Sequence, residues 1–200
     1  MATSSTELLT RLWAKPDDAK LRLVLADLLQ EEGDPWGELI ALQSKKGKRA
    51  NAARLDELKR TLVKRVAGPL AKVSAAESLV LEGGFVTALT TLKSATRAAW
   101  EAAAVAPQWA MVKDVRFDLG TPRWFTTKWA ANPNIAHVQR FSFGRGEMTT
   151  LRLARDGRGW RVTYDRRTSD NFRLLRAMQA GLPEAERAKF EANSEASLRS

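Results

Sequence analysis

The sequence contains no cysteine, and it has one histidine and one tyrosine among its 200 residues. The absence of cysteine excludes a disulfide framework, a thiol nucleophile and a thiolate metal site, and it fits a reducing compartment. The chain also lacks a run of about 18 apolar residues, the minimum for a membrane span. The segment Met1 to Glu7 is polar and does not have the order of a signal peptide. We therefore expect a cytoplasmic protein without a membrane partner.

Motifs that carry known chemistry are also scarce. His137 precedes an apolar residue of a predicted strand, and a lone histidine is far more often packed or exposed than catalytic. The sequence has neither a serine nucleophile elbow nor a phosphate-binding loop. Carboxylate pairs such as Asp17/Asp18 and Glu31/Glu32 stand at predicted helix ends, which explains them. We predict no catalytic residue, no metal site and no cofactor, and thus a protein that is not an enzyme.

Charge is distributed unevenly along the chain, whose net charge is +10. Residues 1–42 hold 4 Lys/Arg and 8 Asp/Glu, a net charge of −4. Residues 43–75 hold 10 and 2, a net charge of +8, and residues 76–200 hold 19 and 13, a net charge of +6. A basic block of this kind binds phosphate backbones or anionic surfaces, or else forms a solvated face.

The most informative pattern is an apolar spacing, φ-x-x-φ-x-φ with φ an apolar residue, that recurs after 26 residues. Full copies begin at Val112 and Val138, and the first copy, at Val86, has only its first two apolar positions, Val86 and Leu89. The Ala-rich stretch 95–106, closed by Pro107, and the segment that begins at Thr121-Pro122 and is closed by Pro133 predict helices between the copies. A period in the twenties is typical of stacked strand-and-helix units with parallel strands and outer helices. Repeats of this kind form binding surfaces far more often than active sites.

The pattern changes after the third copy. A further triplet begins at Met148, only 10 residues after Val138, and the strands around it alternate apolar and polar residues. The stretch 156–159, Asp-Gly-Arg-Gly, predicts the turn of a β-hairpin that covers the last edge of the stack. Helices are expected at 169–181 and 183–192.

Helical patterns precede the repeats. Apolar stripes and capping residues predict helices over residues 4–14, 18–31, 34–42 and 52–66. We predict an α+β fold in which an N-terminal helical unit precedes a short stack like leucine-rich repeats, capped by a β-hairpin and C-terminal helices. The predicted division is a helical head domain at 1–44, a basic linker and helix at 45–68, and a repeat domain at 69–200.

Part of the head resembles a known family. The stretches Pro16–Asp18, Leu23–Leu29 and Glu32–Gln43 are similar to the repeat-companion domain of Myxococcales and Gemmata-type planctomycetes. That family's pattern is roughly Pro, Asp, then Leu-Val-x-Ala-Asp-x-Leu, then Gly-Asp-Pro-x-Gly-Glu-x-Ile-x-Leu-Gln. Leu29 departs from it, because the family often has Trp there. The resemblance implies a bacterial protein with degenerate leucine-rich-type repeats after a Gly-Phe-Val segment, which here is Gly84–Val86. It implies no particular activity.

The polar residues of this motif have two interpretations. In the structural one, Asp34 caps the third helix, Gly33 adopts a positive φ, Gly37 allows close helix approach, and Asp27 bonds to a helix N-terminus or to Arg22. In the functional one, Asp27, Asp34 and Glu38 form a recognition site.

Our first functional hypothesis is a protein-interaction module or adaptor that uses the strand face. Residues between the apolar positions alternate onto the open face of the sheet and are polar with a cationic lean, which suits an acidic or mixed-charge protein partner. The simpler interpretation is a solvated surface. The set is Thr87, Thr90, Lys113, Arg116, Gln139, Ser142, Thr149 and Arg152, of which we name Lys113, Arg116, Gln139 and Arg152 as partner-binding.

The alternative hypothesis is nucleic-acid binding. Arginines interleaved with Trp160 and Tyr164 could grip phosphates and stack bases, although a half-buried hairpin shows the same alternation for structural reasons. Phosphate binding would weaken steeply as salt rises. The residues named for this alternative are Lys45, Lys46, Lys48, Arg49, Arg155, Arg158, Arg161 and Arg166.

Overall fold

Four α-helices occupy the N-terminal part of the chain, close to the predicted positions. The computed structural model describes residues 4–44, 51–92, 94–118, 120–145, 148–156 and 159–163. Two helices begin at the expected caps, because the Ser4 side chain accepts from the N–H of Glu7 and that of Asp18 from the N–H of Leu21. The four helices are α1 (Ser5–Ala14), α2 (Ala19–Glu31), α3 (Pro35–Ser44) and α4 (Ala52–Ala67).

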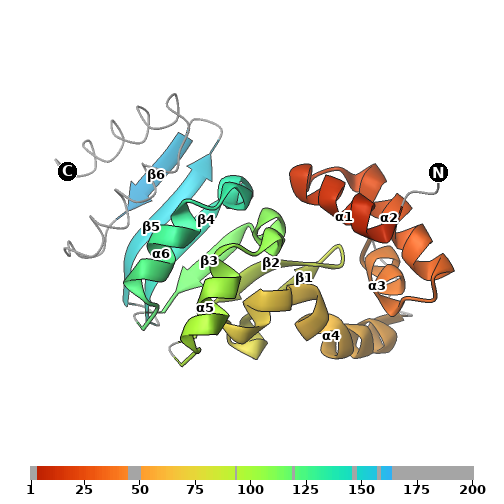
Figure 1. Cartoon of the computed structure of the whole chain (residues 1–200), viewed down its shortest axis with the longest axis horizontal. Helices are drawn as coiled ribbons and strands as arrows, with labels where there is room; N and C mark the ends of the chain where they lie inside the picture. Colours follow the sequence, from red (N-terminus) through yellow and green to blue (C-terminus); the bar gives the residue numbers. More distant parts are fainter. Residues whose placement is uncertain are drawn as a thin grey trace.

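A sheet follows, and its register confirms the repeat. The strands lie in chain order, β1-β2-β3-β4-β5-β6 (Figure 1). The middle strands β2, β3 and β4 run parallel, and Ala88, Asp114 and Arg140 are in register, so each unit is 26 residues long. The strands are β1 (Val80–Glu82), β2 (Phe85–Thr90), β3 (Asp114–Phe117), β4 (Arg140–Arg145), β5 (Met148–Asp156) and β6 (Gly159–Thr163).

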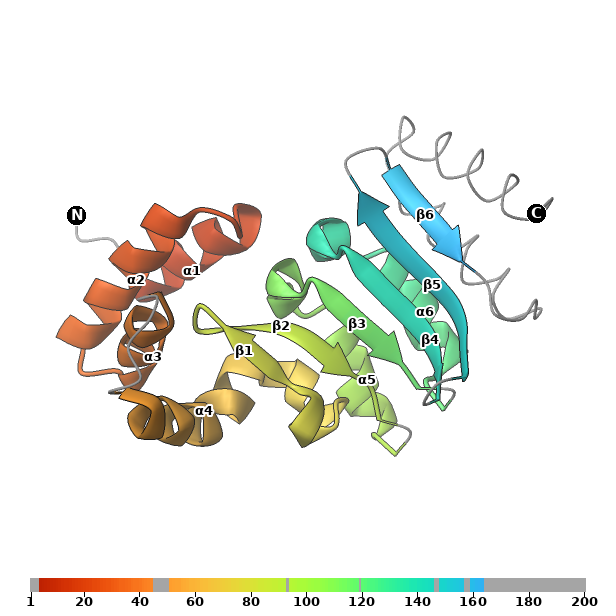
Figure 2. The same ribbon diagram turned by 180° about the vertical axis from the view of Figure 1, so that it is seen from behind.

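The segments between the parallel strands repeat with the same period. Helix α5 (Arg97–Ala104) and the 3₁₀ turn η4 (Pro107–Met111) return 26 residues later as α6 (Arg123–Ala130) and η5 (Pro133–His137). Helices α5 and α6 lie in front of the sheet in Figure 1 and behind it in Figure 2. They cover one face only. The fold is therefore α+β, with a stack of parallel strands and outer helices as predicted.

Large aromatic side chains fill the layer between the helices and the sheet. Trp109 and Trp129 are fully buried with ring centroids 5.6 Å apart, and Phe117 lies 4.8 Å from Trp129. The buried Asn132 side chain donates to the carbonyl of Ala104 at 2.9 Å, which ties one unit to the end of the preceding helix. Because unpaired polar groups are costly in such a core, this bond helps to fix the distance between units.

Antiparallel strands close both edges of the parallel stack. β5 pairs with β4 and β6 pairs with β5, which confirms the predicted hairpin strands. At the other edge, β1 pairs with β2 through a turn at Gly83 and Gly84, a hairpin that the sequence analysis did not predict. The parallel strands therefore lie inside the sheet, and β1 and β6 form its two outer strands. The helices predicted at 169–181 and 183–192, and most of the basic linker, lie outside the described residues.

The head, which we define as helices α1 to α3, docks on the β1–β2 turn. Trp36 donates its indole N–H to the carbonyl of Gly84 at 2.7 Å. Gln43 accepts from the N–H of Gly84 at 2.6 Å and donates to the carbonyl of Leu81 at 2.8 Å. One contiguous core extends through the head and the sheet. The 3₁₀ segments η2 (Gly68–Lys72) and η3 (Ala76–Ser78) connect α4 to β1.

Helices α2 and α3 pack closely because of Gly37. A Cβ atom at this position would lie 2.5 Å from the carbonyl oxygen of Ala26 and 2.7 Å from the amide nitrogen of Gln30. Gly33, between the two helices, has φ +73° and no atom within 4 Å of a Cβ. Both structural expectations for these glycines are confirmed.

We expect Gly37→Ala to lower the free energy of unfolding by about 3 kcal/mol, because backbone atoms of α2 must move to admit the methyl group. Gly33→Ala is the matched control and should cost about 1 kcal/mol, from the left-handed conformation alone. Urea denaturation of both variants measures the difference. Equal losses would contradict the close approach of α2 and α3.

Trp36→Phe should lower the free energy of unfolding by about 1–3 kcal/mol, because the buried carbonyl of Gly84 loses its donor. Trp124→Phe is the control, since Trp124 is half-buried on α6 and makes no hydrogen bond with any residue of the described ranges. Urea denaturation compares the two. A larger loss for Trp124→Phe would show that the indole bond does not hold the head on the sheet.

Candidate functional site

Two of the predicted partner-binding residues lie together where the parallel strands begin. The N–H of Lys113 donates to the carbonyl of Thr87 at 2.8 Å, and the N–H of Gln139 donates to the carbonyl of Lys113 at 2.8 Å. The side chains of Lys113 and Gln139 are exposed, and that of Thr87 is half-buried. The 26-residue period therefore brings these three residues into one row at the amino-terminal edge of the sheet.

The other two predicted residues lie further along the strands. Arg116 is half-buried in β3, in register with Thr90 and Ser142. Ser142 is in turn in register with Arg152 of β5. The four predicted residues thus divide between the amino-terminal edge and a second row that crosses the sheet.

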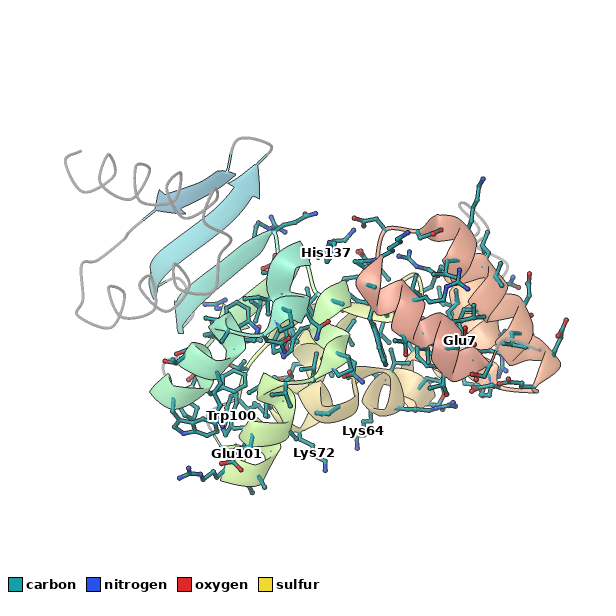
Figure 3. The ribbon with its side chains drawn as sticks, turned by 45° about the horizontal axis from the view of Figure 1, so that its top comes forward. Glu7, Lys64, Lys72, Trp100, Glu101 and His137 are labelled. Atoms are coloured by element: carbon teal, nitrogen blue, oxygen red, sulfur yellow. The ribbon has the colours of Figure 1, made fainter. Side chains whose placement is uncertain are left out.

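A pocket of about 90 Å³ lies beside the first row, between the sheet and the head. Figure 3 shows His137 at this place, where the sheet faces α1 and α2. The pocket combines segments far apart in the sequence, and we call it the head–sheet pocket. It is lined by Pro16, Asp17, Arg22, Glu82, Gly83, Phe85, Thr87, Ala110, Met111, Lys113, His137 and Gln139.

Arg22 is the most unusual member of this lining. Its Nη2 donates to the carbonyl of Pro16 at 2.6 Å, and its guanidinium carbon lies 5.8 Å from the centre of the Phe85 ring. A Cβ on Gly83 would lie 2.7 Å from Nη1, so the guanidinium packs directly on the glycine backbone. The Nε atom is buried and has no hydrogen-bond partner among the described residues.

Charges of both signs surround the head–sheet pocket. Lys113 forms a loose ion pair with Asp17, with 3.9 Å between Nζ and Oδ1, and their side chains are 48% and 79% exposed. Glu82 is also exposed, whereas Arg22 is half-buried. The carboxylates therefore stand in solvent at the rim, where they are screened, and the guanidinium of Arg22 lies deeper.

A second cavity of about 180 Å³ lies between α1, α4 and β2. It is mainly apolar, and Phe85 and Met111 line both cavities. Among its other lining residues, Gln108 has a buried side-chain oxygen without a partner in the described part of the chain. The apolar lining includes Leu9, Trp13, Trp36, Val66 and Val86.

The acidic residues of the head motif hold the helices together. Asp34 accepts from the N–H of Trp36 at 2.9 Å, as the predicted cap of α3, and it pairs with Arg65 of α4. Glu38 pairs with Arg54 of α4 at 2.6 Å, and this bond lowers the pKa of Glu38. The expectation for Asp27 is wrong, because Asp27 is exposed on α2 and bonds to no residue that the structure describes.

Most residues named for nucleic-acid binding lie outside the described ranges, namely Lys45, Lys46, Lys48, Arg49, Arg158 and Arg166. The remaining two lie in the hairpin. Arg155 of β5 is in register with Trp160, and Arg161 of β6 is in register with Ala154. The two arginines are therefore not directly opposite each other on the ladder.

Three observations concern other classes of site. The described residues contain no group of three His, Asp or Glu side chains able to hold a metal ion. None of the helices in the described ranges has the length and apolar character needed to cross a membrane. No protein-family model, curated protein or solved structure matches the chain. The resemblance of residues 16–43 to the repeat-companion domain stays a prediction.

The head contributes Asp17 and Arg22 to the pocket, and the sequence analysis did not include them in the candidate site. No local motif marks them, since they join Lys113 and Gln139 only after the head docks on the sheet. The glycine pair at 83 and 84 is the one sequence signal near the junction, because it allows the turn against which Arg22 and the head pack.

We expect Asp34→Asn to flatten the acid dependence of stability. Burial raises the pKa of Asp34. The hydrogen bonds that Asp34 accepts from Arg65 and from the N–H of Trp36, together with the positive charge of Arg65, outweigh burial and hold the pKa below its usual range. The ion pair therefore stabilises the fold above about pH 4, the unfolded value, and this contribution is lost as the pH falls through the folded pKa. An asparagine at this position still caps α3, because its side-chain oxygen can accept the N–H of Trp36 as the aspartate does.

Urea denaturation at several pH values between 7 and 2 measures this effect. The difference in unfolding free energy between wild type and Asp34→Asn should be greatest at neutral pH and shrink in acid. A constant difference over that range would show that Asp34 acts only as a cap.

Proposed function

We propose that the chain is a non-enzymatic protein-interaction module, an adaptor that binds a protein partner through the face of its parallel strands that no described helix covers. The observation that supports this most is the 26-residue register, which repeats polar residues on one face while the other face packs on helices. In β3, Val115 and Phe117 are fully buried, whereas Asp114 and Arg116, which alternate with them, are only partly buried. We call the uncovered side the open face, formed by Ala88, Thr90, Asp114, Arg116, Arg140 and Ser142.

The chemistry of the open face fits a partner of mixed or acidic charge. Arg140 pairs with Asp114 at 2.8 Å across neighbouring strands, with side chains 70% and 39% exposed. Ion pairs this exposed contribute little to stability, so a partner can exchange them at small cost. Lys113 and Gln139 directly precede β3 and β4, so they adjoin the open face at its amino-terminal edge, where they line the head–sheet pocket. No described helix covers this side of the sheet (Figure 2).

The repeat architecture supports the same proposal. Stacked units place like positions side by side at strand spacing, which produces a continuous polar surface rather than a single reactive centre. Such surfaces bind extended segments or the faces of other proteins through several modest contacts. The rows contain more cationic than acidic side chains, and this excess of positive charge favours acidic partners.

The test is affinity capture from a bacterial lysate with the tagged full chain, after nuclease treatment and at low and high salt. We expect one protein in stoichiometric amount, and Lys113→Glu should reduce its recovery about tenfold, because the reversed charge opposes an acidic partner. Lys72→Glu is the matched control. Lys72 is exposed on η2, and Figure 3 shows it on the opposite side of the molecule from His137.

The outcomes separate the two functional hypotheses. Equal losses in Lys113→Glu and Lys72→Glu would point to net charge rather than to the open face. Recovery of nucleic acid that disappears with nuclease and at high salt would overturn the proposal in favour of the alternative. Binding of the same protein by both variants at the wild-type level would also overturn it.

A further inference from the structure

We propose that Arg22, with Lys113 and Gln139 beside it, forms a binding site for one carboxylate group in the head–sheet pocket, supplied by a Glu or Asp side chain of the protein partner. This inference rests on the proposed function and names the chemistry that the partner must bring. The site lies at the amino-terminal edge of the strands, next to the open face. A segment bound along the strands could therefore place one acidic side chain in it.

The guanidinium of Arg22 supplies the first argument. Only one of its N–H groups has a hydrogen-bond acceptor among the described residues, the carbonyl of Pro16. The Nε atom is buried without a partner, and Arg22 forms no ion pair with a described carboxylate. A ligand cannot reach the covered Nε atom, but Nη1 also lacks an acceptor among the described residues and is not fully covered. A carboxylate is the acceptor that pairs best with guanidinium.

Arg22 is held in place rather than free to turn toward solvent. The Pro16 carbonyl fixes one end of the guanidinium, the Phe85 ring lies 5.8 Å from its central carbon, and the Gly83 backbone lies against Nη1. A group fixed in advance loses little side-chain freedom when a ligand binds. This fixed position distinguishes Arg22 from the exposed lysines of the surface.

The charge balance favours a single negative charge over a phosphate. Arg22 and Lys113 face the pocket together with the carboxylates of Asp17 and Glu82, and His137 is the remaining titratable group of its lining. The rim carboxylates oppose a dianion or a polyanion more strongly than a monoanion. The volume of about 90 Å³ suits a side-chain carboxylate rather than a nucleotide.

The experiment is a titration followed by NMR, with acetyl-glutamate amide as the probe and acetyl-glutamine amide as its neutral isostere. The reporters are the Nε–H signal of Arg22, identified by its absence in Arg22→Lys, and the side-chain amide signals of Gln139. We expect saturable shifts of both with the glutamate probe only. Inorganic phosphate, tested at the same ionic strength, should shift neither in a saturable manner.

Variants measure the contribution of each cation. Arg22→Gln should weaken the glutamate probe at least about tenfold, as expected for a lost bond between charged groups. Lys113→Gln should weaken it about threefold, because Lys113 is exposed. Lys72→Gln should have no effect. Because Arg22→Gln removes packing as well as charge, its fold is checked by its amide spectrum, and Lys113→Gln provides the test if that variant does not fold.

Each result bears on the inference. Equal shifts with the glutamate and glutamine probes, or saturable binding of phosphate alone, would overturn it. If the glutamate probe does not bind but protein capture is still lost in Lys113→Glu, the carboxylate site is wrong and the proposed function stands. If both fail, the open face and the pocket have no role in binding an acidic partner.

Discussion

Gly84 lies where the head meets the sheet, with φ +83° and with both of its backbone polar groups bonded to head side chains. A Cβ atom there would lie 2.2 Å from the side-chain Cγ1 and 3.2 Å from the Cα of Ile40, so α3 packs directly on the glycine. The preceding Gly83 also lacks a side chain, and the guanidinium of Arg22 packs against its backbone. This single turn sets the position of the head and, with it, the shape of the head–sheet pocket. The edge of the sheet and the docking of the head thus depend on the same two residues.

The repeat could be predicted from the sequence because its cause is local. Each unit buries an apolar strand against its own helix. The spacing of Val112, Val115 and Phe117 therefore predicts both where the strand lies and which of its side chains face the helices. Helix caps such as Ser4 and Asp18 are equally local, and their positions were predicted to within a residue. The β1–β2 hairpin was missed because β1 is only three residues long and has one buried side chain. Such a strand exists because β2 and the head hold it, which no short pattern reveals.

The candidate site could be predicted only in part, and for a physical reason. Lys113 and Gln139 were found because each follows the first apolar position of its copy, and the 26-residue period places them in one row. They precede β3 and β4, so their exposure depends on the edge of the sheet rather than on alternation along a strand. Arg22 and Asp17 belong to the head, and their position beside the strands depends on tertiary contacts through Trp36 and Gln43. For Asp27 the sequence predicted a bonded side chain that the structure does not have. Its neighbours in the sequence are apolar, but Asp27 itself lies exposed on the outer surface of α2. Burial on a helix depends on which side meets a neighbour, and that is decided by packing.

The antiparallel closure of both edges has a consequence for the evolution of the chain. The head and the β1–β2 turn occupy one end, and β5 closes the other, so the interior unit from Asp114 to Gln139 begins and ends against copies of its own geometry. Duplication or loss of such a unit would leave both ends chemically unchanged. Each added unit would widen the sheet by one strand, about 4.8 Å. Chains of this architecture can therefore differ in length by multiples of one repeat, and the width of the sheet would change with them in steps.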